Sequence, residues 1–190
     1  MIGDQRSTAF GMTNSAPVDL PRSAEIVWAF SAGPTDSRTT WHPVLDAAAD
    51  LAARHDEQWS AEDASRDGGD DDRAVARAKR RIDALNRARM ELVDRVDAWA
   101  EVAVIGEAAA SSLHTETLGL VVDRLAVAWV RSRRVAGLAG PGPDGRDDAR
   151  RALTLLVQLC DAYDDLVRDL RDGGRRLPVW RTLKRYGSRG

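Results

Sequence analysis

The chain has 190 residues, and its 28 lysines and arginines nearly balance its 30 aspartates and glutamates. This length suits one domain with a sizeable core, and the charge balance argues against a general affinity for nucleic acid or an anionic membrane. The single cysteine, Cys160, excludes an intramolecular disulfide, and no cysteine–histidine pattern of a structural zinc site occurs.

Residues 1–40 are predicted to form a partly ordered arm, followed by a single domain over residues 41–190. The first 23 residues mix Gly, Ser, Thr, Asn and Pro with little periodicity. The apolar run at residues 24–32 (AEIVWAFSA) contains a glutamate and is too short for a signal peptide or a membrane span. We therefore expect a soluble, cytoplasmic protein.

Two helices and a turn are predicted in the first half of the domain. The first helix spans about residues 43–66, because it opens with a proline and its apolar residues recur at steps of three and four. Residues 67–72 (DGGDDD) break this pattern and predict a turn rather than a metal loop. The second helix is predicted over about residues 71–109, with an unbroken apolar seam.

Three further helices are predicted in the second half. A helix from residue 114 or 115 to about 135 is apolar around most of its circumference, and residues 137–145 (GLAGPGPDG) read as a loop. The next helix spans about residues 147–172 and is stopped by the glycines at 173–174; a short helix is predicted at residues 178–186. The predicted class is all-α, an antiparallel four-helix bundle with an N-terminal arm and a short C-terminal helix.

Arg89 is a permanent cation within the apolar seam of the second predicted helix. The seam passes through Ile82, Leu85 and Leu92 at helical spacing, and Arg89 lies almost directly below Ile82. An unpaired buried cation costs several kcal/mol. Arg89 must therefore meet a carboxylate, a set of carbonyl groups or an anionic ligand.

The neighbouring helices offer carboxylates for Arg89. Glu62 and Asp63 lie on the first helix, and Asp123 lies on the third. Gly119 shares a face with Asp123, and its missing side chain allows a neighbouring helix or a ligand to come close. Two interpretations stand side by side: an internal salt-bridge network that fixes the helix register, and a site for an anionic ligand.

Other reactive side chains have simpler structural interpretations. His55 has no serine or cysteine nucleophile evidently paired with it, so a satisfied core histidine is favoured over a general base. The aspartates at 161, 164, 165 and 169 suggest ligands for a divalent cation, but interleaved arginines favour a solvated, salt-bridged face. Trp59 and Trp129 are candidates for the wall of a pocket.

Several reaction classes are disfavoured by missing motifs. The sequence contains no phosphate-binding loop, no dinucleotide-binding glycine turn, no nucleophile elbow and no Glu-x-x-His pair of a two-metal bundle. ATP hydrolysis and hydride transfer are therefore poor candidates. No metal ligand and no cofactor are predicted, although the binding of a divalent cation is kept as an alternative.

The order of the charged motifs resembles the bacterial DUF4254 family (domain of unknown function 4254). The residues that carry the resemblance are Trp59, Glu62, Asp63 and Arg66, then Lys79, Arg80, Ile82, Asp83, Asn86 and Arg89, then Thr115, Glu116, Gly119, Asp123, Arg124 and Leu125, and last Lys184 and Tyr186. The family pattern has other residues at Arg87, Met90, Glu91, His114, Leu118 and Gly187. If an active site uses the amides lost there, these departures imply a different substrate or a lost activity.

The resemblance implies a cytoplasmic helical protein of a bacterial cell-surface polysaccharide or specialised-metabolite pathway, with no established reaction. A weaker similarity to the helical chorismate mutases covers about one helix, where Arg80 or Arg81, Ile82, Asp83 and Arg89 mimic an arginine clamp for a dicarboxylate.

The leading hypothesis is an enzyme or binding protein for an anionic small molecule, with inward basic side chains on the anion and a carboxylate as general acid or base. The candidate catalytic residues are Glu62, Asp63, Glu116 and Asp123. The candidate substrate-binding residues are Lys79, Asp83, Asn86, Arg89, Arg124, Trp59, His55, Lys184 and Tyr186. The alternative is a non-catalytic scaffold or partner-binding protein, such as a homodimer or the partner of a pathway enzyme, whose polar network is structural. Neither nucleic acid nor a membrane is an expected partner.

Overall fold

The structure, a computed structural model, describes residues 20–34, 42–67, 71–104, 111–138, 140 and 142–179. This part of the chain is mainly helical, and the predicted all-α class is confirmed. Its helices are α1 (Ser23–Ala32), α2 (Pro43–Asp67), α3 (Asp72–Ala103), α4 (Leu118–Leu138) and α5 (Pro143–Arg171). Two short strands, β1 (Ser112–Leu113) and β2 (Arg175–Arg176), pair in parallel.

The four long helices predicted from periodicity correspond to α2, α3, α4 and α5. Asp71 caps α3, because its side chain accepts hydrogen bonds from the backbone N–H groups of Arg73 and Ala74 at 2.9 and 3.2 Å. Helix α5 begins at Pro143 rather than near residue 147, since proline fits the first turn of a helix. Most of the short helix predicted at residues 178–186 lies outside the described residues.

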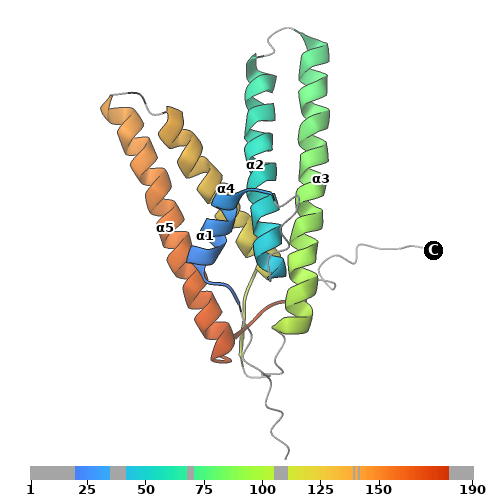
Figure 1. Cartoon of the computed structure of the whole chain (residues 1–190), viewed down its shortest axis with the longest axis vertical. Coiled ribbons are helices and arrows are strands. Elements are labelled where there is room, and N and C mark those ends of the chain that lie inside the picture. Colours follow the sequence, from blue (N-terminus) through green and yellow to red (C-terminus); the bar gives the residue numbers. More distant parts are fainter. Residues whose placement is uncertain are drawn as a thin grey trace, which may run out of the picture.

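The four long helices form two antiparallel hairpins, and α4 is the helix through which the two hairpins contact each other. Helix α2 packs against α3, α4 packs against α5, and α4 also packs against both α2 and α3. Figure 1 shows the two hairpins spreading apart toward the upper ends of α3 and α5. Within the described residues, α5 contacts α4, α1 and β2. Polar side chains on α4 are therefore placed against residues of both α2 and α3.

Helix α1 lies within the segment for which the sequence predicts an arm, and it contributes to the core through side chains such as Phe30, which is 2% exposed. Helix α5 fixes the start of α1. Asp164 accepts hydrogen bonds from the backbone N–H and the hydroxyl group of Ser23, both at 2.8 Å, and the Tyr163 hydroxyl donates to the carbonyl oxygen of Pro21 at 2.9 Å. These bonds join residues that are far apart in the sequence.

The core lies where α1, α2, α3 and α4 meet. Its apolar side chains include Val44, Leu51, Val93, Val96, Val122 and Leu125, each at most 2% exposed. Polar side chains are buried beside it: Ser23, His42, His55, Asp97, Thr117 and Ser132. Across the described residues, no helix combines the length and the apolar composition that a membrane span needs.

Candidate functional site

Three ionisable side chains from three helices meet at Asp123, and we call them the Asp123 centre. Nε2 of His55 on α2 lies 2.8 Å from Oδ1 of Asp123 on α4, and Nε of Arg89 on α3 lies 3.5 Å from the same oxygen. The side chains of His55, Asp123 and Arg89 are 8%, 14% and 25% exposed. The centre is thus an acid, a base and a cation that are mostly removed from solvent.

The two contacts with Asp123 differ in strength. His55 and Asp123 are hydrogen-bonded, whereas Nε of Arg89 is buried and has no hydrogen-bond partner among the described residues. Its 3.5 Å contact with Asp123 is longer than an N–H···O hydrogen bond, which is typically about 2.9 Å. A buried donor without an acceptor costs free energy. Arg89 is therefore an incompletely satisfied cation whose exposed portion an anion from solvent can reach.

The pairing of His55 with Asp123 has chemical consequences. A carboxylate that accepts a hydrogen bond from an imidazole fixes the tautomer and the orientation of the ring. Such a pair can take up or release a proton at a nearby substrate atom. The centre therefore combines a proton-transfer group with a cation, although the sequence analysis favours a structural histidine.

The predicted carboxylates on α2 do not pair with Arg89. Glu62 accepts a hydrogen bond from Nε2 of Gln58 at 3.0 Å and lies 3.8 Å from Arg66, and Asp63 lies 2.6 Å from Arg66. Their side chains are 41% and 43% exposed. These carboxylates form local ion pairs on the surface of α2, which contribute little to stability.

Other predicted residues extend along the helices that carry the centre. Asn86 lies one helical turn from Arg89 on the same face of α3 and is half-buried, as is Trp59 on α2. Lys79 and Asp83 lie further along α3 and are exposed. Two more, Lys184 and Tyr186, lie outside the described residues.

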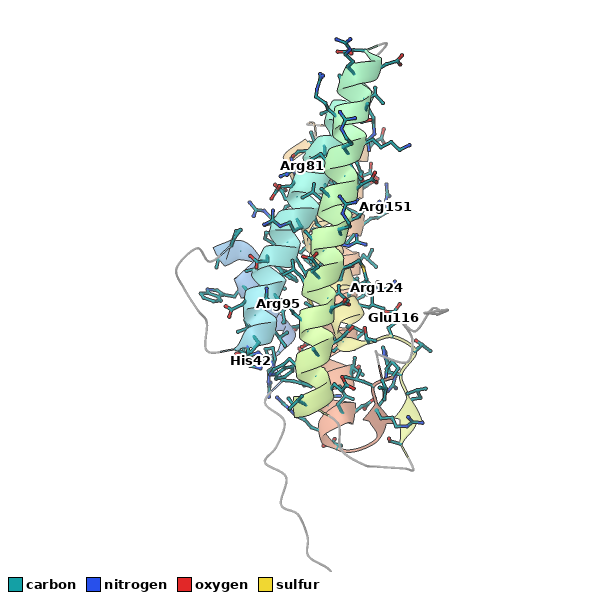
Figure 2. All side chains as sticks on the ribbon, turned by 90° about the vertical axis from the view of Figure 1, so that its right-hand side faces the viewer. His42, Arg81, Arg95, Glu116, Arg124 and Arg151 are labelled. Carbon is teal, nitrogen blue, oxygen red and sulfur yellow. The ribbon has the colours of Figure 1, made fainter. Side chains whose placement is uncertain are left out.

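Glu116 and Arg124 belong to a separate groove of about 310 Å³ between α4 and α5. They form an ion pair with each other, and Figure 2 shows them close together on one side of the molecule. A second ion pair in this groove joins Nε of Arg175 to Oδ2 of Asp169 at 3.1 Å. Both arginines thus have carboxylate neighbours, although Nε of Arg175, like that of Arg89, is buried without a hydrogen-bond partner among the described residues.

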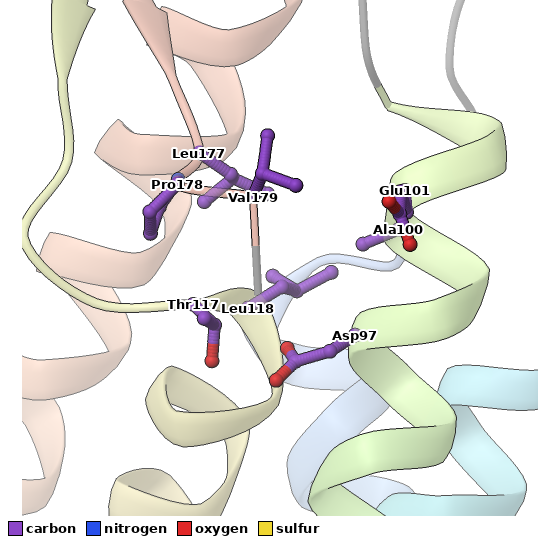
Figure 3. Close-up of a pocket in the computed structure, with 8 residues that line it drawn as sticks. All are labelled: Asp97, Ala100, Glu101, Thr117, Leu118, Leu177, Pro178 and Val179. Atoms are coloured by element: carbon purple, nitrogen blue, oxygen red, sulfur yellow. The ribbon is translucent and has the colours of Figure 1, made fainter. Parts of the chain in front are cut away.

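The sequence analysis missed Asp97, which lies on α3 and is 3% exposed. Its Oδ1 accepts a hydrogen bond of 2.6 Å from the backbone N–H of Gly119 in the first turn of α4. Figure 3 shows the carboxylate beside Thr117 and Leu118, where α4 begins. A sequence signal existed: Arg89, Val93 and Asp97 recur at steps of four and so share one face of α3.

Gly119 marks the closest approach of α3 and α4. A Cβ atom at this position would lie 2.4 Å from the carbonyl oxygen of Val93 and 2.8 Å from Oδ1 of Asp97. Real side chains essentially never show such distances. Because Gly119 has no side chain, α3 can lie this close to α4. Of the two expectations for Gly119, a neighbouring helix or a ligand, the structure shows the helix.

Burial raises the pKa of Asp97 above its ordinary value of 3.8, although hydrogen bonds from Gly119 and Thr117 oppose the increase. The folded protein thus holds this proton more tightly than the unfolded chain does. The contribution of Asp97 to the free energy of unfolding is fully present below pH 3.8 and is lost as the pH rises through the raised pKa.

We expect Asp97→Asn to remove this pH dependence, because an amide oxygen still accepts from Gly119 and does not ionise. Urea unfolding of both proteins at about pH 4 and about pH 7 measures the effect. Relative to Asp97→Asn, the wild type should lose stability between the lower and the higher pH. A difference that is constant or moves in the opposite direction would contradict a raised pKa.

The described residues contain no group of three or more His, Cys, Asp or Glu side chains that could hold a metal ion. The predicted acidic face of α5 is occupied by local contacts, since Asp165 pairs with Arg168 at 2.8 Å and Asp164 caps α1. Burial, followed by the charges of Asp164 and Asp161, raises the pKa of the Cys160 thiol. This environment disfavours a thiolate nucleophile.

A known protein family matches most of the chain. A family model described as "Protein of unknown function (DUF4254)" matches residues 46–179, which is more than half of the chain. The matched range contains all three residues of the Asp123 centre as well as Gly119 and Asp97. No curated protein and no solved structure matches the chain.

Proposed function

The chain belongs to the DUF4254 family, and the residues that match the family model include the Asp123 centre. We propose that this centre binds an anionic small molecule. Arg89 holds the anion, and the His55–Asp123 pair moves a proton to or from the bound molecule. The observation that carries the proposal is that Arg89, whose buried Nε has no hydrogen-bond partner among the described residues, lies beside the hydrogen-bonded His55–Asp123 pair. A carboxylate or phosphate would accept hydrogen bonds from the terminal nitrogens of the Arg89 guanidinium group, whose side chain is 25% exposed.

The surroundings of Arg89 support the same role. Asn86 lies one turn away on the same face of α3, is half-buried and adds hydrogen-bonding groups. A half-buried arginine with incomplete pairing binds an anion more strongly than an exposed one, because solvent screens it less. The proposed setting is a bacterial cytoplasmic pathway for cell-surface polysaccharides or specialised metabolites, as the family resemblance implies.

Replacing Arg89 with methionine is expected to leave the free energy of unfolding within about 1 kcal/mol of the wild type, because methionine keeps the buried length and Asp123 retains His55 as its partner. The same change is expected to abolish anion binding. Thermal unfolding of the full chain measures both effects, alone and with a panel of sugar phosphates, nucleotide sugars and dicarboxylates.

Arg95→Met is the matched control, since Arg95 lies on the same helix and is exposed. At least one panel anion should raise the unfolding temperature of the wild type and of Arg95→Met, and should have no effect on Arg89→Met. If no anion stabilises the wild type, or if Arg89→Met responds like the control, the proposal is wrong.

The alternative is a scaffold in which the Asp123 centre only fixes the positions of the helices. Leu153 and Val157 favour it, because they lie four residues apart on one face of α5 and are 55% and 51% exposed. If the protein is a scaffold, Arg89→Met should lower the free energy of unfolding by about 3 kcal/mol, as expected when a buried ion pair loses one partner. The stability measurement therefore separates the two functions.

A further inference from the structure

A second groove, which we call the Trp129 groove, lies between the end of α1, the middle of α2 and the second half of α4. Its volume is about 500 Å³, within the range of about 300–1,000 Å³ that is usual for small-molecule sites. Phe30, Ala52 and Val130 form an apolar floor and are at most 2% exposed. The Trp129 ring lies beside Phe30, with the ring centroids 5.6 Å apart.

Part of the groove is open because α2 contributes two alanines to its lining, beside Asp56. Ala52 and Ala53 face the space that Trp129 and Phe30 border from the other helices. A flat apolar group placed there would contact the Trp129 ring and displace water from its accessible surface. The shape and the lining therefore suit an aromatic or similarly flat ligand body.

Two arginines line the groove, and they differ in how they are paired. Nε of Arg134 donates to Oδ1 of Asp56 at 2.7 Å, and its terminal nitrogen donates to the Asp56 carbonyl oxygen and to Oγ of Ser60 at 3.0 and 2.8 Å. The charges of Arg134 and Asp56 thus neutralise each other.

Arg133 instead stacks on the wall of the groove. Its guanidinium carbon lies 4.8 Å from the centroid of the Trp129 ring, and among the described residues it pairs with no carboxylate. Among the described residues, the groove therefore carries one positive charge without a carboxylate partner, next to an aromatic wall. A cation held over a ring is also partly ordered before any ligand binds, which lowers the entropy lost on binding.

We propose that the Trp129 groove binds a small molecule with a flat apolar body and one anionic group, such as an aryl carboxylate. The apolar body lies against Trp129, over the floor that Phe30, Ala52 and Val130 form, and the anionic group accepts hydrogen bonds from Arg133. This site shares no residue with the Asp123 centre. It therefore stands whether or not the function proposed for Arg89 is correct.

Isothermal titration calorimetry of the full chain with 2-naphthoate tests the proposal, with the uncharged 2-naphthamide as the matched ligand. We expect a Kd of about 1 mM or lower for the naphthoate, and a Kd about tenfold higher for the amide. Arg133→Gln should weaken naphthoate binding about tenfold and leave amide binding unchanged, since it removes the charge and little of the contact area.

Two further variants complete the experiment. Arg131→Gln changes the net charge equally on the same helix but lies outside the groove, so it should bind naphthoate like the wild type. Ala53→Leu places a larger side chain in the groove and should abolish the binding of both ligands. Thermal unfolding confirms that each variant is folded.

Three results would overturn the proposal: no heat of binding for naphthoate with the wild type at several times the expected Kd, equal weakening by Arg133→Gln and Arg131→Gln, or full binding by folded Ala53→Leu. Arg89→Met should retain naphthoate binding. A failure at the Trp129 groove is therefore distinguishable from a failure at the Asp123 centre.

Discussion

Replacing Gly119 with alanine is expected to lower the free energy of unfolding by about 2–3 kcal/mol, although alanine favours helices more than glycine does. The added Cβ would lie 2.4 Å from the carbonyl oxygen of Val93, which belongs to the backbone of α3. A backbone atom within a long helix cannot move away cheaply, so α3 and α4 must separate. Urea unfolding followed by circular dichroism measures the loss.

Gly137 provides the control for this substitution, because it lies near the end of the same helix and a Cβ there would meet nothing within 4 Å. Gly137→Ala is expected to leave the free energy of unfolding unchanged or to raise it by up to about 1 kcal/mol. If the two variants are equally stable, helices α3 and α4 do not approach each other as closely as described.

The substitution Asp123→Ala is expected to lower the free energy of unfolding by about 3 kcal/mol, the lower end of the cost of breaking a buried ion pair. His55 loses a hydrogen-bond acceptor at 2.8 Å, and Arg89 loses its nearby negative charge. The lower end applies because Arg89 is 25% exposed and water can solvate part of its charge.

A double-mutant cycle separates the two partners of Asp123. In the Arg89→Met background only His55 is left without a partner, so Asp123→Ala should cost about 1 kcal/mol less than in the wild type. Asp161→Ala, an exposed aspartate on α5, should change stability by no more than about 0.5 kcal/mol. If Asp123→Ala lowers the free energy of unfolding no more than this control does, the Asp123 centre is solvated and contributes little to stability.

Helical periodicity predicts the features of this protein that depend on neighbours in the sequence. The seam of α3 identified Arg89 as a cation in need of a partner, and Asp123 was one of three carboxylates offered for it. The choice among those carboxylates depends on how α4 crosses α2 and α3, which periodicity does not determine. The same holds for His55, whose partner lies 68 residues away.

Other features depend on distant contacts, and the sequence analysis missed them. Helix α1 has a short apolar face, and the bonds between Ser23 and Asp164 span 141 residues. The sequence of α3 alone does not distinguish Asp97 from the other acidic residues of this helix, because its hydrogen-bond donor, Gly119, lies at the start of α4. Trp129 was a candidate for the wall of a pocket, but the space beside it depends on what Ala52 and Ala53 leave unfilled, and a missing volume has no periodic pattern.

The contacts between α1 and α5 also constrain the order in which the core is completed during synthesis. The chain is made from its N-terminus, so α1 is produced first among the helices described and α5 last. Ser23 and Pro21 cannot form their hydrogen bonds to α5 until about 140 further residues have been translated. The apolar face of α1 therefore stays incompletely covered on the ribosome until α5 emerges. The contacts between α2 and α3 are local in sequence, so we expect this hairpin to fold first.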